Sequence, residues 1–129
     1  AAAVADYRPK VTHEEKLKKQ DGNLHIELER TKDILKALGE RKTEQFLVGF
    51  AAETKDHKQY GMDKLKRKNL DAIVINNVAQ EGAGFGSETN IVTYLNKNFE
   101  ETEIPKAPKK EVARKILKLI LQDMKDEEA

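Results

Sequence analysis

Gln45-Phe46-Leu47-Val48-Gly49-Phe50 and Ala72-Ile73-Val74-Ile75 are two short, continuous apolar runs that decide the fold class. A continuous run of this length is typical of a strand that is buried on both faces of a parallel sheet. Residues 55–69, between the two runs, have a helical composition, although Gly61 costs that helix about 1 kcal/mol relative to alanine. The centre of the chain therefore predicts a strand, a helix and a second strand.

Downstream of this unit, the residues Ile91-Val92-Thr93-Tyr94-Leu95 predict a further strand, and residues 96–104 are expected to return as its hairpin partner. Pro105 and Pro108 precede the clearest helical pattern. Its apolar residues recur at helical spacing and are Val112, Ala113, Ile116, Leu117, Ile120, Leu121 and Met124. Strands that alternate with helices predict an α/β, three-layer, Rossmann-like sheet.

Upstream of the centre, the period-two alternation over residues 24–28 predicts a half-buried strand. A helix is expected to begin at Thr31, a plausible N-cap, and to end at Gly39. The nearly all-polar residues 10–22 predict a mobile flap with one helical turn at most. The opening run Ala1-Ala2-Ala3-Val4-Ala5 predicts a buried strand that is already under way, so we expect a fragment of a longer protein.

The bulk composition limits the classes of function. The chain has 129 residues, enough for one domain, with 24 Lys and Arg against 23 Asp and Glu. A net charge of +1 does not indicate binding to nucleic acid. The absence of cysteine excludes disulfides, and His13, His25 and His57 are not at metal-ligand spacing, so no metal ligand is expected. No apolar stretch is long enough to predict a membrane span, so a cytoplasmic protein is expected.

Two groups of lysines are candidates for an anion site. Lys64 and Lys68 are one helical turn apart and follow Phe50, where a strand is expected to end. Ligands of open α/β sheets bind at the carboxyl ends of strands, and Asp6 also follows an expected strand. The flap carries Lys16, Lys18 and Lys19. For both groups the alternative is a solvated surface with no ligand.

The glycine-rich run Gly82-Ala83-Gly84-Phe85-Gly86 does not have the spacing of a dinucleotide-binding fingerprint, and a strand rather than a helix is expected after it. No nucleophile elbow or Walker motif is present. The residue patterns alone thus indicate an α/β protein with a candidate nucleotide site.

Several short motifs, in order along the chain, carry a more specific resemblance. They are Ala1 to Pro9, Glu15-Lys16-Leu17-Lys18-Lys19, Val48-Gly49-Phe50-Ala51-Ala52-Glu53-Thr54, Lys64, Lys68-Asn69-Leu70-Asp71 and Gly84-Phe85-Gly86-Ser87-Glu88-Thr89-Asn90. Over about residues 1–120 the chain resembles the C-terminal part of bacterial phosphopantothenoylcysteine synthetase. The resemblance implies that residues 1–129 are the C-terminal portion of a single synthetase domain, with a flap at about 10–22.

The resemblance also implies a set of nucleotide contacts. They fall at Ala2, Asp6, Lys16, Lys32, Asp33, Ile34, Leu35, Phe50, Lys64 and Lys68. Of these, residues 32–35 would read the cytosine through backbone groups, the lysines would hold the phosphates, and Lys16 would be catalytic. One departure is Asn77, where the family usually has Asp. The family's glycine-rich phosphate segment would lie upstream of residue 1.

The implied activity is a ligase of coenzyme A biosynthesis, which joins L-cysteine to 4'-phosphopantothenate through an acyl-cytidylate made from CTP, with Mg²⁺ on the phosphates. FMN would belong only to a fused decarboxylase domain outside this chain. The family implies a homodimer, with residues 91–104 at the contact, and the fragment alone is expected to be inactive. The alternatives are an ATP-using synthetase and a non-catalytic fragment that binds nucleotide or dimerises.

Overall fold

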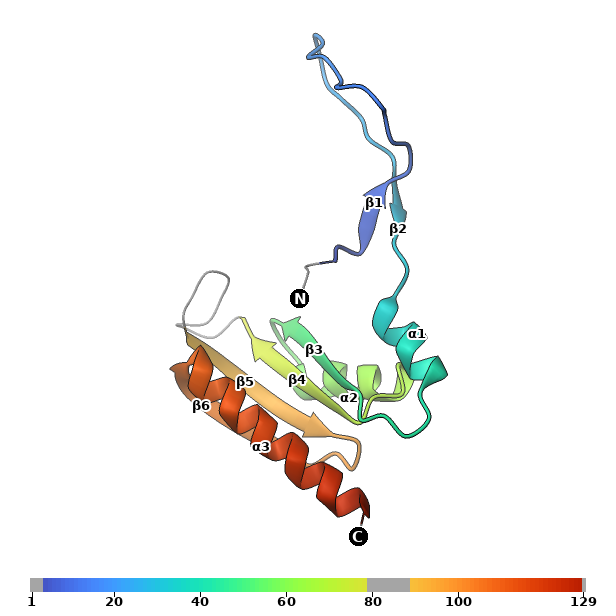
Figure 1. Cartoon of the computed structure of the whole chain (residues 1–129). Helices are drawn as coiled ribbons and strands as arrows, with labels where there is room; N and C mark the ends of the chain where they lie inside the picture. The colour runs from blue at the N-terminus through green and yellow to red at the C-terminus, as the bar shows by residue number, and fades with distance from the viewer. Residues whose placement is uncertain (1–3, 79–88, 129) are drawn as a thin grey trace. The chain divides into compact units, whose positions relative to one another are not determined.

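The fold is described from a computed structural model, which describes residues 4–78 and 89–128 of the chain (Figure 1). Contacts within the chain divide it into two units, one up to Ile34 and one from Leu35 onward. Each unit is described by itself. Ala2 and the glycine-rich run 82–86, both singled out from the sequence, lie outside the described residues.

The first unit is built on a two-stranded antiparallel ribbon of β1 (Tyr7–Pro9) and β2 (Leu28–Arg30). Arg8 lies opposite Glu29, and its Nε is 2.8 Å from a Glu29 carboxylate oxygen. Below this ribbon, the Thr31 hydroxyl donates a hydrogen bond of 2.6 Å to the carbonyl of Ala5. The cross-strand bonds therefore join the two ends of a long loop.

Two sequence predictions fail in this unit. Residues 24–27 form no strand, and Leu24 is 72% exposed, because nothing in this unit covers the alternating apolar side chains. Val4 and Ala5 are exposed and not part of a buried strand. Residues 10–22 contain no helical turn, which agrees with a polar segment that has no apolar face to bury.

The second unit is a four-stranded sheet with the order β3-β4-β5-β6. Its strands are β3 (Val48–Glu53), β4 (Ala72–Asn77), β5 (Thr89–Asn96) and β6 (Glu101–Pro108). β3 and β4 run parallel and are connected through α2 (His57–Arg67), whereas β4, β5 and β6 pair in antiparallel fashion. This order confirms the strand–helix–strand centre and the hairpin predicted from the sequence.

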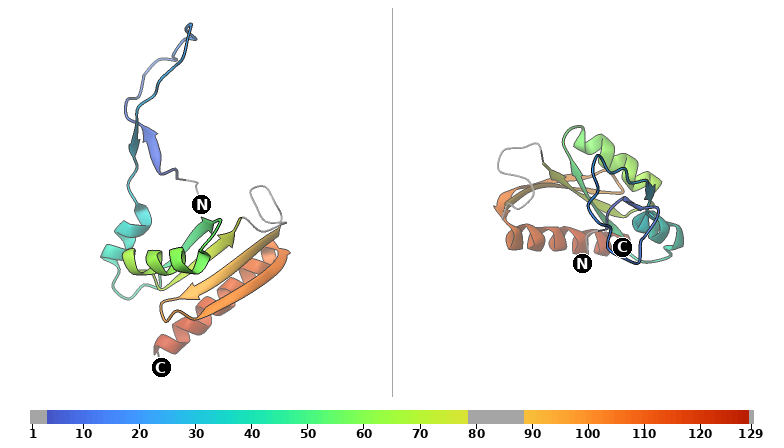
Figure 2. Two further views of the ribbon diagram at one scale, coloured as in Figure 1. Left: turned by 180° about the vertical axis from the view of Figure 1, so that it is seen from behind. Right: turned by 90° about the horizontal axis from the view of Figure 1, so that it is seen from above.

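Helices cover both faces of the sheet, as the two views of Figure 2 show. α2 and the short α1 (Ile34–Arg41) pack with a core that includes Ile73, Ile75 and Leu95. α3 (Lys109–Glu128) packs on the opposite face, against Val74 and Tyr94. Successive side chains of β4 thus point to opposite helical layers, which explains its continuous apolar run. The predicted three-layer, Rossmann-like α/β fold is confirmed.

Three details of this unit differ from the sequence predictions. Phe50 is 71% exposed, because β3 is an edge strand and α3 does not cover its outer face. Gly39 lies inside α1 and does not end it. β6 includes Pro105 and Pro108, which an edge strand tolerates because its outer N–H groups have no ladder partner. No helix in residues 4–78 and 89–128 combines the length and apolarity needed to cross a membrane.

Candidate functional site

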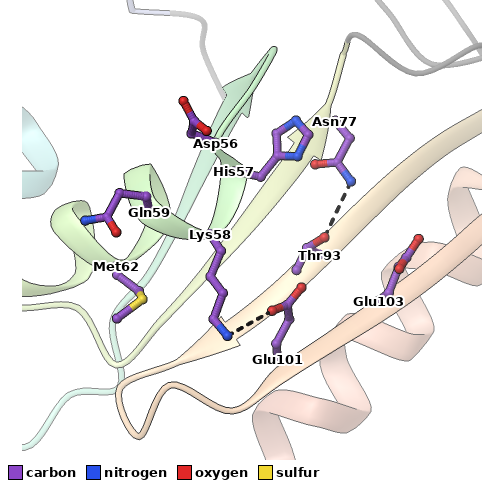
Figure 3. A pocket seen from close by; sticks show the side chains of 9 residues that line it. All are labelled: Asp56, His57, Lys58, Gln59, Met62, Asn77, Thr93, Glu101 and Glu103. Atoms are coloured by element: carbon purple, nitrogen blue, oxygen red, sulfur yellow. Dashed lines mark hydrogen bonds and ion pairs between the residues drawn. The ribbon is translucent and has the colours of Figure 1, made fainter.

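A pocket of about 650 Å³ lies at the amino end of α2 in the second unit (Figure 3). The carboxyl ends of β3 and β4 lead to it, and this is the edge at which open α/β sheets bind ligands. Its lining residues are Asp56, His57, Lys58, Gln59, Met62, Asn77, Thr93, Glu101 and Glu103. The side chains come from four separate elements, as the sticks in Figure 3 show.

The register of the sheet places three polar side chains on the floor of this pocket. Thr93 lies opposite Ile75 on one side and opposite Glu103 on the other, so all three share the face on which α2 packs. Asn77, two residues after Ile75, is on that face as well. The floor therefore changes from apolar beneath α2 to polar beyond its first turn.

Two buried polar atoms in this pocket have no hydrogen-bond partner among residues 4–78 and 89–128. Asn77 is 3% exposed, and its Nδ2 donates a long bond of 3.4 Å to the Thr93 hydroxyl, but its Oδ1 has no partner. The Nε2 atom of His57 is likewise buried without a partner. A buried polar atom with no partner costs about 1–3 kcal/mol, so Asn77 and His57 are candidates for a functional contact.

The charges that line the pocket are mainly negative. Lys58 forms an ion pair of 3.5 Å with Glu101, which leaves Asp56 and Glu103 without a lysine or arginine partner among the described residues. Asp56 precedes α2 with a positive φ of 51° and makes no side-chain hydrogen bond to the first turn. The first N–H groups of α2 are thus not capped by that side chain.

A second opening lies beside the C-terminal turns of α3, and several of the side chains that line it form ion pairs or hydrogen bonds within the protein. The buried carboxylate of Asp71 is 3.1 Å from Lys42 and 3.4 Å from Lys97, and it accepts a hydrogen bond of 2.7 Å from the Leu47 N–H. Tyr94 donates a bond of 2.7 Å to Asp123. Burial, together with the Asp123 carboxylate, raises the pKa of Tyr94 well above its ordinary value. These contacts satisfy each other and indicate a structural role.

The residues predicted from the sequence as nucleotide contacts do not gather in the pocket of Figure 3. Those in the first unit are Asp6, Lys16, Lys32, Asp33 and Ile34. Lys16 is exposed and lies with Lys18 and Lys19 around a hollow in their own loop.

The predicted contacts in the second unit are Leu35, Phe50, Lys64 and Lys68. Leu35 packs on the α2 core, and Lys64 forms an ion pair of 3.0 Å with Glu53. Lys68 is the C-cap of α2, so it does not continue the helical face of Lys64. Phe50 lies opposite Val74 in the sheet and presents an exposed ring to solvent.

Sequence reasoning missed the role of the pocket residues. His57 was considered only as a metal ligand, and Asn77 only as a departure from a motif. The sequence does contain one signal for this pocket. Thr93 is a polar residue within the apolar run of β5, and Glu101 and Glu103 are two residues apart in β6, so their side chains point to one face of the sheet. Within the described part of the chain, no three His, Cys, Asp or Glu side chains are grouped so that they could hold a metal ion.

Together, the parallel β3–α2–β4 unit and the polar pocket at its carboxyl edge define a domain of the three-layer α/β class with a candidate ligand site. Residues 1–124 match the family described as "DNA/pantothenate metabolism flavoprotein C-terminal domain". The match spans nearly the whole chain, so the chain belongs to this family.

The relatives agree with this family. The chain is 55% identical over 119 residues to the "Coenzyme A biosynthesis bifunctional protein CoaBC" of Bacillus subtilis, covering 92% of the chain and 29% of that protein. It is 46% identical over 122 residues to a "Cysteine/Cysteine sulfinic acid decarboxylase" of an unknown prokaryotic organism, covering 94% of the chain and 34% of that protein. The chain therefore spans about a third of the length of these curated relatives.

A solved structure of the "C-terminal Domain of Coenzyme A biosynthesis bifunctional protein CoaBC" matches with a TM-score of 0.71 and 51% identity. The match covers 97% of this chain and 55% of that one. A flavoprotein of DNA/pantothenate metabolism from Streptococcus pneumoniae matches with a TM-score of 0.70 at 19% identity, which shows a shared fold.

These comparisons correct the assignment made from the sequence. The matched family is named as a flavoprotein C-terminal domain rather than as a synthetase, and the one reaction named among the relatives above is a decarboxylation. The assignment to a CTP- or ATP-dependent phosphopantothenate–cysteine ligase is therefore withdrawn. Its substrates 4'-phosphopantothenate, L-cysteine and CTP, its Mg²⁺ and its homodimer are withdrawn with it. The name of the Bacillus subtilis relative calls it bifunctional. It does not say which of the two functions belongs to the part of that protein that this chain matches.

The expectation that FMN concerns only a fused domain outside this chain also does not follow from the family name, which is that of a flavoprotein. Two of the openings described above nevertheless do not fit a flavin. The pocket of Figure 3 has no aromatic ring in its lining and three carboxylates against one lysine, which suits neither an isoalloxazine ring nor a phosphate. The opening beside α3 is lined by Asp71, Asp123, Asp126 and Glu127 and is equally unsuited to an anion. No flavin-dependent step is therefore derived for these residues.

Proposed function

We propose that this chain is the C-terminal portion of one domain in a coenzyme A biosynthesis protein, and that it helps to bind 4'-phosphopantothenoylcysteine. We further propose that the longer protein decarboxylates this compound, with the flavin held outside the residues described here. The observation that carries the proposal is the 51% identity, over 97% of the chain, to the C-terminal domain of a coenzyme A biosynthesis protein. A cytoplasmic location is part of the proposal, because the compounds of such a pathway are intracellular metabolites.

The residues proposed to contact the phosphorylated compound are those singled out from the sequence. Lys16 acts from the flap at about residues 10–22, and Ala2, Asp6 and residues 32–34 contribute from the same unit, whereas Leu35 belongs to the second unit. Lys64 and Lys68 supply positive charge at α2, and Lys64 must exchange its ion pair with Glu53 for the ligand. The exposed ring of Phe50 supports this proposal, because an aromatic side chain that nothing covers is suited to lie against a ligand.

A chimera tests the proposal. Residues 1–124 replace the matched segment of the Bacillus subtilis relative, and the chimera is expressed in cells depleted of their own protein. We expect restored coenzyme A, measured by mass spectrometry, and release of CO₂ from 4'-phosphopantothenoylcysteine by the purified chimera. A folded chimera that does neither refutes the function.

The site residues are tested in the same chimera by Lys16→Gln, which keeps the length of the side chain and removes its charge. We expect coenzyme A formation to fall about 100-fold, the loss typical of a charge that acts on the transition state. Lys109→Gln, an exposed lysine at the start of α3, is the matched control and should change nothing. If both variants behave alike, the role of Lys16 is wrong although the function of the family stands.

A further inference from the structure

One row of apolar side chains on α3 is buried against the sheet, and a second row is exposed. Val112 and Ile116 belong to the buried row, whereas Leu117 and Leu121 are 59% and 57% exposed. A helix turns by about 100° per residue, so residues that directly follow a buried row lie beside it. The exposed row is the α3 stripe, which consists of Ala113, Leu117, Leu121 and Met124.

The α3 stripe borders the part of the sheet that no helix covers on this face. α3 packs chiefly on β5 and β6, and in Figure 1 it lies in front of the sheet and runs from upper left to lower right, with β3 uncovered. Because a right-handed helix turns clockwise along its direction, the residues after the buried row are on the side toward β3. β3 is an edge strand with a continuous apolar run, which is typical of a strand covered on both faces. The stripe and the free side of β3 therefore border one uncovered region.

The solved C-terminal domain supplies a candidate for what covers this region. It matches 97% of this chain, but the chain covers only 55% of it, so about 45% of that domain has no counterpart here. A row of large apolar side chains that remains exposed on a helix marks an interaction surface. In a three-layer sheet, the element that lies beside one helix on the same face is another helix.

The charges next to the stripe indicate the chemistry of that helix. Arg114 and Lys118 directly follow Ala113 and Leu117, so they form a basic border along the solvent side of the stripe. Both are exposed, and neither forms an ion pair with another side chain in residues 4–78 and 89–128. A helix that packs on the stripe would meet this border with its own edge, and acidic side chains there would complement it.

We propose that a helix from the remaining part of the larger domain packs beside α3, with its apolar side on the α3 stripe and acidic side chains toward Arg114 and Lys118. The proposal rests on the proposed function in one respect, which is that the chain is the C-terminal portion of one larger domain. It does not depend on the reaction. The stripe lies on α3, so the contact does not require Phe50, which is proposed above to meet the ligand.

The test compares residues 1–129 with the chimera described above, using Leu117→Cys in a chain that has no cysteine of its own. The rate at which iodoacetamide modifies the thiol at position 117 is measured by mass spectrometry of the peptide that carries it. We expect modification to be at least about tenfold slower in the chimera, where the contact must open first. Lys115→Cys, which is exposed on the other side of the same helix, is the matched control and should react at the same rate in both proteins.

Equal rates at position 117 in the chimera and in residues 1–129 refute the contact. Protection in residues 1–129 alone that grows with protein concentration would mean that a second copy covers the stripe, and it refutes the contact as well. A chimera that circular dichroism shows to be unfolded also counts against it, because the two surfaces then do not fit. Release of CO₂ is measured on the same chimera, so a protected thiol without that activity refutes the reaction and leaves the contact standing.

The basic border is tested by the double substitution Arg114→Glu and Lys118→Glu. We expect it to lower the Tm of the chimera by about 2–4 °C, because two attractive pairs become repulsive, and to change the Tm of residues 1–129 by no more than about 1 °C. Lys115→Glu is the matched control and should leave both Tm values unchanged. If the double substitution affects both proteins equally, the border does not face acidic side chains, and this part of the proposal is wrong.

Discussion

The substitution Gly39→Ala is expected to destabilise the second unit, because the backbone of α1 touches the turn after α2. A Cβ atom on Gly39 would lie 1.8 Å from the carbonyl oxygen of Lys68 and 2.8 Å from its carbonyl carbon. The neighbouring Asn69, whose φ is 54°, donates a hydrogen bond of 2.9 Å from its Nδ2 to the carbonyl of Gly39. Glycine at position 39 is thus required by a close approach of two backbones.

The size of the effect follows from this geometry. Real Cβ contacts are essentially never shorter than 3.0 Å, so the backbones must separate by at least about 1.2 Å, the difference between that limit and 1.8 Å. A backbone carbonyl cannot rotate out of the way, and the bond from Asn69 would lengthen. Overpacking costs about 1–3 kcal/mol and the strained hydrogen bond about 1 kcal/mol, while the better helix propensity of alanine returns about 1 kcal/mol. We expect a net loss of about 1–3 kcal/mol.

Urea and thermal unfolding, followed by circular dichroism, measure this loss. For a chain of this size the expected fall in Tm is about 3–12 °C. Glu40→Ala, in the next position of the same helix and exposed to solvent, is the matched control and should change stability by no more than about 0.5 kcal/mol. If Gly39→Ala is as stable as the wild-type protein, α1 does not pack against the turn at Lys68 as described.

Three further substitutions test the core of the second unit. Asp71→Asn leaves Lys42 and Lys97 without their carboxylate and should lower the free energy of unfolding by about 2–4 kcal/mol in urea titration. Tyr94→Phe removes the bond to Asp123 and should cost about 1–2 kcal/mol. Because the pKa of Tyr94 is raised on folding, its contribution should be complete below the unfolded value of about 10 and decrease as the pH rises above it, measured as Tm against pH. Phe50→Ser should change stability by no more than about 0.5 kcal/mol, since the ring is exposed, and a larger loss would show that it is covered.

The layered part of the fold was predictable because its sequence patterns coincide with its burial. The run at residues 72–75 is apolar at every position since β4 has a helix on each face, and α3 follows its i+4 pattern through Val112 and Ile116. The strand predicted over residues 24–28 was wrong, because period-two alternation shows only that a strand at this position would have two chemically different faces. Whether anything covers the apolar face depends on contacts distant in sequence, and in this unit Leu24 remains exposed.

The pocket could not be predicted from the sequence, since its chemistry depends on the register of three strands. A shift of one residue in the pairing of β5 would turn Thr93 away from Asn77 and Glu103 and place an apolar neighbour on the floor. The sequence shows that Asn77 follows a buried strand, which marks the edge where ligands bind. The negative charge of this edge comes from the fold, which brings Asp56, Glu101 and Glu103 around one pocket with Lys58 as the one lysine in its lining. The lysines that sequence reasoning favoured are placed elsewhere, so at this pocket a cationic ligand fits better than a phosphate.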